Sequence, residues 1–578
     1  MKLELQKGSR SVILAIILAI LASAFVLRLF YLQVIQHEYY SDLADSEQVT
    51  RLKIPATRGL IYGLNGDTPV KLVMNETVYT VFADPAMVDD PEKVERVMKE
   101  IAGGNVRKGF EELLVVEGSR YQVIATNITR IQADKIKNEK LHGIGFQAVS
   151  QRVYPEGSMA SQVLGFVNVE GVGNYGIEGA LNDTLMGVDG RLESVTDIAD
   201  VPLTIGNKNI RIPAQDGKNV VLSIDRNIQA KAEQALSDGL KRTGAKQGSI
   251  LVMNPNNGQV MAMANLPTYD QSKYYEVSDL HLFNNPIISR PYEPASVIKP
   301  FTMATAVDKG VAKASDTYLN EGRIRVDDRW IANAYQGQRG EITFQTMMNW
   351  SLNTGTVTLL QRLGDGKSIT KSARETLYDY FYNKFRLAQR TGIELSGEAA
   401  GEIVSPDRVE GNAVRYSNMS FGQGMNTTAI QVAAGFSSVI NGGEYYKPTV
   451  VAGEVKDGQF IKNKPSESLG RTVSSGTSLA VRKMLVDARQ EFYSIYDRKG
   501  YNIGGKTGTS ETIKDGAYTD RQTVGSYVGF GGGEKPEYVV MIVLSGEDQN
   551  LQGARDAVPI FNDISNWLLG YLGVQPKG

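Results

Sequence analysis

The stretch Pro294-Ala295-Ser296-Val297-Ile298-Lys299-Pro300 places a serine and a lysine three residues apart, where the sequence predicts the start of an apolar helix. Proline is tolerated there because the first four N–H groups of a helix have no partner within it. Residues three apart share one face of a helix, so Ser296 and Lys299 are expected to be neighbours. A neutral lysine amine can take the serine proton, and the positive end of the helix favours the resulting alkoxide. The stretch therefore predicts a serine nucleophile with a lysine base.

Two further short motifs follow this one along the chain. Ser351-Leu352-Asn353 comes about 55 residues later, and Lys506-Thr507-Gly508-Thr509 lies near the C-terminus. Their order and spacing match the Ser-x-x-Lys, Ser-x-Asn and Lys-Thr-Gly signature of the penicillin-binding proteins and serine β-lactamases. A second Ser-x-x-Lys, Ser368-Ile369-Thr370-Lys371, has no Ser-x-Asn between it and Lys506. We interpret this second copy as an ordinary solvated stretch.

Composition excludes several other kinds of chemistry. The chain has 578 residues, enough for two or three domains, and a net charge of −2, which gives no indication of nucleic-acid binding. It has no cysteine, so disulfides, thiolate catalysis and thiolate metal sites are excluded. The three histidines, His37, His142 and His281, are too scattered to predict a metal site. A Ser-His-Asp triad would need His281, which we place in a loop or core, so lysine is favoured as the base.

The N-terminus carries a candidate membrane anchor. Residues 1–10 are basic, residues 11–27 form an unbroken apolar run, and Arg28 follows with aromatic residues after it. This length is near the lower limit for a spanning helix, and Arg28 can extend to the far interface. A cleaved signal peptide and a buried core helix are the alternatives, but no small-x-small cleavage site follows. We expect a cytoplasmic tail over 1–10, an uncleaved anchor over 11–35, and the rest of the chain on the outer side.

The remainder reads as two α+β domains. Residues 36–212 are predicted to form a mixed α/β domain, with a hairpin turning at Asn65-Gly66. Residues 213–578 are predicted to hold an antiparallel sheet, built in part from the Lys506 strand and the strand-like runs 526–530 and 538–544. Residues 219–225 are predicted to form a strand, 431–440 a core helix and 406–419 a loop-like connection.

Together these features resemble a class B penicillin-binding protein. The resemblance rests on the anchor, the hairpin around Arg58-Gly59, the segment 152–190 and the three motifs, which occur in the family's order. It implies a non-catalytic pedestal, of the dimerisation type, followed by a serine D,D-transpeptidase domain in which helices flank an antiparallel sheet. Too few residues precede Arg58 for the glycosyltransferase domain of the class A proteins. We interpret Arg58, Arg152 and Glu178 as structural ion-pairing residues of the pedestal rather than a partner surface.

The resemblance also assigns roles to the residues of the motifs. Ser296 would be the acylated nucleophile and Lys299 its base, and Ser351 would pass protons to the leaving amine. Asn353 would hold Lys299 and the substrate amide. Backbone N–H groups of the nucleophile and of the last motif residue would form the oxyanion hole. The terminal carboxylate of the substrate would be bound by Lys506, Thr507 and Thr509, with Gly508 allowing close approach of the ligand. No cofactor and no metal are implied.

The implied reaction is the cross-linking of peptidoglycan stem peptides ending in D-Ala-D-Ala, with release of the terminal D-Ala. The implied ligands include β-lactam antibiotics, and the implied partners are a polytopic membrane glycosyltransferase and other division-complex proteins. A compact pedestal and the run Thr427-Thr428-Ala429-Ile430-Gln431 favour a septal role. An elongation enzyme, a β-lactamase and a non-catalytic scaffold of the division complex remain alternatives.

The chain departs from the family pattern at four places. Pro294-Ala295 stands where Pro-Gly is usual, and Ser351-Leu352-Asn353 where Ser-Ser-Asn is usual. Gly63-Leu64 replaces an Asp-Arg pair of the hairpin, and Arg386-Leu387-Ala388 replaces a Gly-Phe-Gly run. None of these changes removes a side chain that is assigned to bond-making.

Overall fold

The computed structural model describes residues 9–40, 49–195, 210–335, 337–464, 466–514 and 517–577. It divides into two compact units, which are described separately below. The first comprises Met1–Arg58 and Gly187–Gly217, and the second comprises Gly59–Met186 and Lys218–Gly578.

The first unit holds the apolar helix and a small sheet. Helix α1 (Ser9–Phe30) is followed by a π-helical turn, Tyr31–Ile35, and residues 10–30 are exposed. The segment Arg10–Ile35 is long and apolar enough to cross a membrane, which agrees with the predicted anchor helix. The sheet is antiparallel, in the order β1-β8-β9. Its strands are β1 (Val49–Ile54), β8 (Gly190–Val195) and β9 (Ile210–Ile212).

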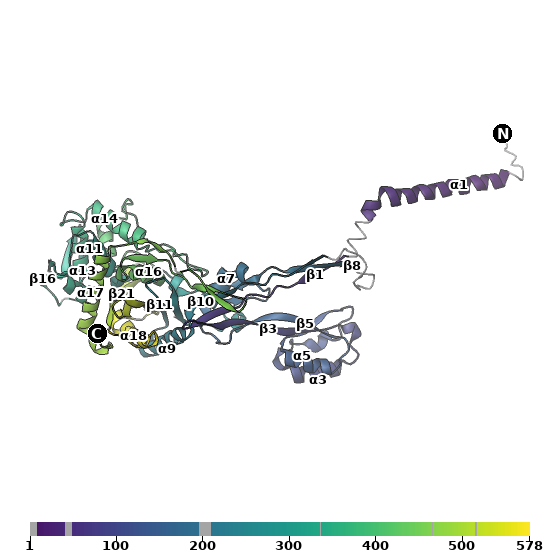
Figure 1. The fold of residues 1–578 in the computed structure, drawn as a ribbon, viewed down its shortest axis with the longest axis horizontal. Helices are drawn as coiled ribbons and strands as arrows, with labels where there is room; N and C mark the ends of the chain where they lie inside the picture. The colour runs from purple at the N-terminus through teal and green to yellow at the C-terminus, as the bar shows by residue number, and fades with distance from the viewer. Residues whose placement is uncertain are drawn as a thin grey trace. The chain divides into compact units, whose positions relative to one another are not determined.

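The N-terminal part of the second unit is a mixed α/β module with its own core. The predicted hairpin is confirmed, since β2 (Ile61–Asn65) and β3 (Thr68–Ala83) pair across a turn in which Gly66 has φ +60°. Asp90 and Thr129 cap the two main helices of this module. Figure 1 shows these helices beside β3 and β5. The remaining elements are β4 (Gln122–Ile128), β5 (Ile144–Val153), α3 (Pro91–Ala102) and α5 (Arg130–Asn138).

A seven-stranded sheet joins strands that are far apart in the sequence. Its order is β19-β18-β10-β2-β3-β4, with β5 also paired to β3. Strand β10 (Asn219–Asp225) runs parallel to β2 and antiparallel to β18. The predicted boundary between residues 212 and 213 stays a prediction, because this sheet takes strands from both sides of it. The other two strands are β18 (Val451–Lys456) and β19 (Gln459–Lys462).

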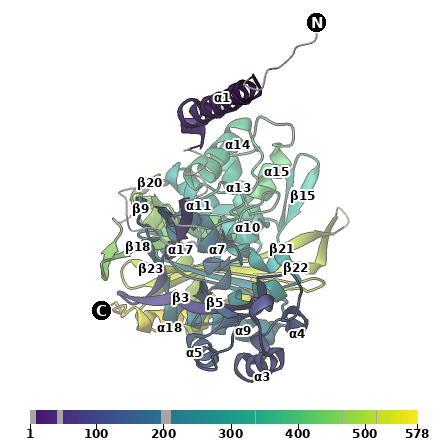
Figure 2. The same ribbon diagram turned by 90° about the vertical axis from the view of Figure 1, so that its right-hand side faces the viewer.

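A five-stranded antiparallel sheet, in the order β12-β11-β23-β22-β21, forms the centre of the C-terminal part. Successive residues of its strands enter different cores: Val539 and Met541 pack in one, and Tyr538 and Val540 in the other. Figure 2 shows α9 and α18 on one side of β21–β23 and α11 and α17 on the other. The predicted α+β fold, an antiparallel sheet flanked by helices, is confirmed. The strands are β11 (Gln247–Met253), β12 (Val260–Leu266), β21 (Asn502–Lys514), β22 (Ala517–Gly532) and β23 (Pro536–Ser545). The main helices are α9 (Arg226–Thr243), α11 (Lys299–Asp308), α16 (Ala429–Ile440), α17 (Ser475–Tyr493) and α18 (Val558–Tyr571).

Candidate active site

Ser296 lies on a tight turn that leads into helix α11. A 3₁₀ turn, Ala295–Ile298, is continued directly by α11, so Ser296 and Lys299 lie on one turn of chain as predicted. Ser296 is half-buried and Lys299 is fully buried. The turn is held from outside by a hydrogen bond of 2.9 Å from the Ala295 N–H to the carbonyl of Gly422.

The amine of Lys299 is bound by the Ser-x-Asn motif. Its Nζ donates to the carbonyl oxygen of Ser351, to Ser351 Oγ at 3.2 Å and to Asn353 Oδ1 at 2.8 Å. Ser351 has φ +56°, just after α12 (Phe344–Trp350), and this left-handed conformation presents both of its oxygens to the amine. Asn353 opens α13 (Asn353–Arg362), and its Nδ2 also donates to Ala332 O at 2.9 Å. One amide hydrogen of Asn353 is therefore bonded within the protein.

The Lys-Thr-Gly strand packs against the turn that carries Ser296. A Cβ added to Gly508 would lie 2.9 Å from the carbonyl oxygen of Pro294 and 2.4 Å from Ser526 Oγ, so only glycine fits. Lys506 is 4% exposed, and its Nζ donates to Thr507 O and Oγ1, both at 3.2 Å. The close approach of Gly508 to Pro294 brings the third motif to the first.

Burial sets the protonation of the two lysines. It lowers the pKa of Lys506 to about 7. Burial, and then the nearby charge of Lys506, lowers the pKa of Lys299 well below its usual value. Both causes favour the neutral amine of Lys299, which is the form that can accept a proton.

The five residues predicted to act in catalysis come together: Ser296 and Lys299 share a turn, Ser351 and Asn353 bind the lysine amine, and Lys506 acts on it electrostatically. Of the residues predicted to bind substrate, Thr507 is half-buried, Gly508 is buried against the nucleophile turn, and Thr509 is exposed. Among the described residues, no group of His, Asp and Glu side chains is arranged to hold a metal ion.

Three groups of the site were not found from the sequence. They are the carbonyls of Ser351 and Ala332, and the N–H of Gly553, which donates to Thr509 Oγ1 at 3.2 Å. All three are backbone groups, so the residue type carries no signal for them. Ala332 ends the short hairpin of β14 (Arg323–Val326) and β15 (Arg329–Ala332).

The second Ser-x-x-Lys copy lies at the surface, as predicted. Ser368 Oγ donates to Asp365 at 2.7 Å, and Lys371 forms an exposed ion pair with Asp407. His281 was expected in a loop or in the core, and it is exposed in the 3₁₀ turn Leu280–Phe283, which excludes the core position.

The expected pedestal ion pair forms between Arg152 and Glu178. Their side chains lie 2.8 Å apart and are 5% and 0% exposed, so this is a buried structural contact. Arg152 also donates to Asn75 Oδ1 at 2.7 Å. Arg58 belongs to the other compact unit, and its inclusion in this network stays a prediction.

The departures from the family pattern coincide with unusual backbone positions. Ala295, Arg386 and Ala388 have φ of +52°, +54° and +63°, and each stands where the family usually has glycine. The backbone keeps a conformation that glycine adopts freely, at a cost of roughly 1–2 kcal/mol for each side chain. Gly63 is constrained by space instead, because a Cβ there would lie 2.7 Å from Leu72 Cδ1 and 2.9 Å from Ile224 O.

Comparison with known proteins agrees with this geometry. The model of the penicillin-binding protein transpeptidase domain matches residues 248–566, and that of the penicillin-binding protein dimerisation domain matches residues 53–222. Stage V sporulation protein D of Bacillus subtilis (strain 168) is 30% identical over 565 residues, which are 95% of this chain and 84% of the relative. The probable peptidoglycan D,D-transpeptidase PenA of Neisseria gonorrhoeae is 25% identical over 571 residues, which are 97% of this chain and 92% of that protein.

Solved structures give the same result for the fold. Penicillin-binding protein 3 of Mycobacterium tuberculosis, solved with aztreonam, has a TM-score of 0.68 and 25% identity, over 91% of this chain and 98% of that one. A peptidoglycan synthetase from Bifidobacterium adolescentis has a TM-score of 0.71 at 21% identity, over 92% of this chain and 98% of that one.

The fold and the site thus define a penicillin-binding transpeptidase domain that follows a dimerisation-type module. Within that class, the chain belongs to the class B penicillin-binding proteins, and its activity is that of a peptidoglycan D,D-transpeptidase.

Proposed function

We propose that Ser296 forms an acyl-enzyme with the stem peptide of peptidoglycan. Its Oγ bonds to the penultimate D-Ala carbonyl carbon, the amide C–N bond breaks, and the terminal D-Ala leaves. Lys299 takes the hydroxyl proton, and Ser351 passes it to the departing nitrogen. An amine of a neighbouring stem then attacks the ester, which forms the cross-link and frees Ser296. The observation that carries this proposal is the buried Lys299 amine, hydrogen-bonded to Ser351 Oγ and Asn353.

The same proposal assigns the binding groups. Lys506, Thr507 and Thr509 bind the terminal carboxylate, and Asn353 binds the substrate amide with its remaining hydrogen. The N–H groups of Ser296 and Thr509 stabilise the oxyanion, at about 3 kcal/mol for each donor. The closeness of Gly508 to Pro294 supports this pairing, because it brings the Thr509 strand beside the nucleophile turn.

Labelling by a fluorescent penicillin tests the nucleophile. We expect Ser296→Ala to abolish covalent labelling, because no ester can form without the hydroxyl. Ser368→Ala, in the second Ser-x-x-Lys copy, is the matched control and should label like the wild type. Labelling that survives in Ser296→Ala would overturn the assignment. Rapid hydrolysis of nitrocefin would instead indicate a β-lactamase, because a transpeptidase releases the acyl group slowly.

We also infer the topology and the cellular role. Residues 1–10 lie in the cytoplasm, 11–35 cross the membrane, and the pedestal (36–212) and transpeptidase domain (213–578) lie outside. The basic residues before α1 support this orientation. The role is septal cross-linking beside a polytopic glycosyltransferase of the division complex. Depletion tests the role: filamentous cells support division, and round cells would place the enzyme in elongation.

A further inference from the structure

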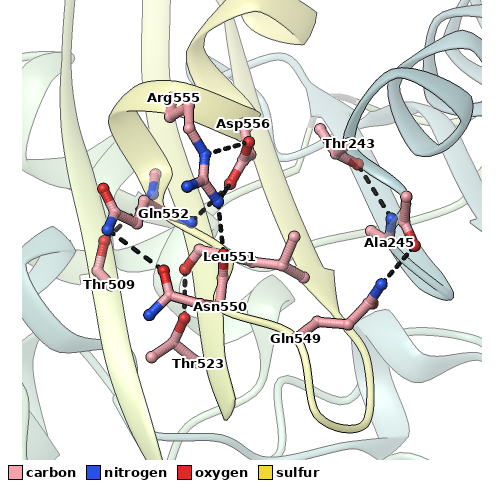
Figure 3. A network of polar contacts seen from close by, with 12 residues as sticks. Thr243, Ala245, Thr509, Thr523, Gln549, Asn550, Leu551, Gln552, Arg555 and Asp556 are labelled. Carbon is pink, nitrogen blue, oxygen red and sulfur yellow. Dashed lines mark hydrogen bonds and ion pairs between the residues drawn. The ribbon is translucent and has the colours of Figure 1, made fainter. Parts of the chain in front are cut away.

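The loop between β23 and α18 lies along β22, the strand paired with the one that carries the third motif. Thr523 of β22 donates from its N–H to Gln549 O at 2.9 Å and from Oγ1 to Leu551 O at 2.6 Å. Figure 3 shows this loop with Thr509, Thr523 and the neighbouring end of α9. Gln549 ties the loop to that end of the helix, because its Oε1 accepts from Lys246 N at 3.0 Å.

Gly553, within this loop, sits directly on the backbone of the Lys-Thr-Gly strand. A Cβ at this position would lie 2.3 Å from Ser526 O and 2.5 Å from Gly508 O, so no side chain fits. The N–H of Gly553 donates to Thr509 Oγ1 at 3.2 Å. A backbone donor thus occupies one acceptor position of a hydroxyl that is assigned to substrate binding.

Asp556 holds this donor in place. The carboxylate is 3% exposed, and its Oδ2 accepts from the N–H of Gln552, the residue before Gly553, at 2.8 Å. Arg555 donates to both of its oxygens, at 2.9 and 2.8 Å, as Figure 3 shows. Arg242 of α9 donates to the backbone carbonyl of Asp556 at 2.7 Å. The N–H of Asp556 also donates at 2.8 Å to the carbonyl of Gln552, which belongs to the same peptide as the Gly553 N–H.

We propose that Asp556 is a positioning residue, which orients the Thr509 hydroxyl for the anionic end of the substrate. A hydroxyl has one hydrogen to donate and two lone pairs. Since Gly553 N–H takes up a lone pair, the hydrogen turns away from the loop. An ionised carboxylate only accepts hydrogen bonds, so it needs that hydrogen. This inference rests on the proposed role of Thr509 in binding the substrate carboxylate.

Asp556→Asn in the full chain tests the proposal. The measurement is the second-order rate constant of acylation by benzylpenicillin and by its uncharged methyl ester. We expect about a tenfold loss with the acid and less than about twofold with the ester, because a hydrogen bond to a charged group is the one weakened. Thr509→Val should show the same selectivity. Asp556→Asn should add little when Thr509 is already valine, because the two changes act on one interaction.

Controls separate this inference from loss of folding and from failure of the proposed function. Asp563→Asn removes a carboxylate that is 53% exposed in its ion pair with Lys231, and it should leave both rate constants unchanged. Gly553→Ala is the second variant if Asp556→Asn does not fold. Its added Cβ must push the loop off the strand, so it should also lower the ratio of acid to ester rates. Equal losses with acid and ester, or additive losses in the double variant, would overturn the inference. If Ser296→Ala abolishes acylation but the Asp556 and Gly553 variants keep the wild-type ratio of acid to ester rates, only this inference fails. If Ser296→Ala is still acylated, the proposed function itself fails.

Discussion

At the scale of single residues, the site depends on two buried lysines whose charged forms are both disfavoured. Lys299 and Lys506 are both buried, and both pKa values fall, with the charge of Lys506 adding to the shift on Lys299. The proposed chemistry needs opposite states of the two: a neutral Lys299 to take the serine proton, and a charged Lys506 to bind a carboxylate.

This requirement predicts a bell-shaped pH dependence of acylation. The second-order rate constant with a penicillin should rise with pH as Lys299 loses its proton. It should fall as the pH passes about 7, because Lys506 then becomes neutral in the free enzyme. Rapid-mixing measurements over the pH range check this. Lys506→Arg is the control and should lose the descending limb, since arginine stays charged. A wild-type profile that stays level above neutral pH would contradict the assignment.

Residue types also determined how much of the site could be predicted. The side chains of the site, from Ser296 to Lys506, could be predicted because they belong to short motifs that are recognisable in the sequence. The carbonyl of Ser351 and the N–H of Gly553 could not be predicted, because every residue type except proline offers the same backbone groups. The left-handed backbone of Ala295 was equally hidden, since alanine gives no signal for it.

At the scale of helices and strands, the local sequence pattern predicted single elements, but it did not predict which distant strands pair. The runs that form β10, α16 and β23 were predicted nearly to their ends, because each is long and bounded by capping or turn residues. The segment 406–419 was predicted to be a loop, and this was wrong for its second half. Residues Ala413–Met419 form helix α15, which is capped by Asn412 and too short to show a helical period. The parallel pairing of β10 with β2 joins residues about 160 apart, and no local pattern predicts it.

Contact between the Lys506 strand and the nucleophile turn leads to a prediction for Gly508→Ala. The added Cβ would meet Pro294 O at 2.9 Å and Ser526 Oγ at 2.4 Å, so strand and turn must separate. We expect acylation to fall by about a hundredfold or more, because small displacements of reacting groups have effects of this size. Gly476→Ala is the matched control. It lies in α17, where an added Cβ has no described neighbour within 4 Å, and it should stabilise the helix by about 0.5–1 kcal/mol without changing acylation. Equal activity of the two variants would show that the contact is dispensable.

At the scale of the whole molecule, the apolar helix is suited to a bilayer and the catalytic fold has a buried core of its own. Residues 10–30 are exposed, and the length and apolar character of Arg10–Ile35 suit a bilayer, whereas the apolar side chains of α11, the helix that carries Lys299, pack in a buried core. The sequence predicted this division because an apolar run of this kind is visible without any knowledge of folding.

A chain that begins after residue 35 should therefore leave the membrane and keep its chemistry. We expect the full chain to sediment with membranes and the shortened one to stay in the supernatant. Both should react with penicillin at rates within about twofold, because all residues assigned to the site belong to the other compact unit. Centrifugation and labelling measure the two properties. A shortened chain that still sediments would show that another surface binds the membrane.

The seven-stranded sheet limits how members of this family can be recombined. Strand β10 hydrogen-bonds to β2 on one side and to β18 on the other. A chimaera joined at residue 212 would therefore pair β2 of one protein with β10 of another. The side chains of β2 and β10 would then come from different proteins and would have to pack against unfamiliar neighbours. An exchange that moves all seven strands together keeps the ladder whole, and such exchanges offer the safer route to hybrid enzymes.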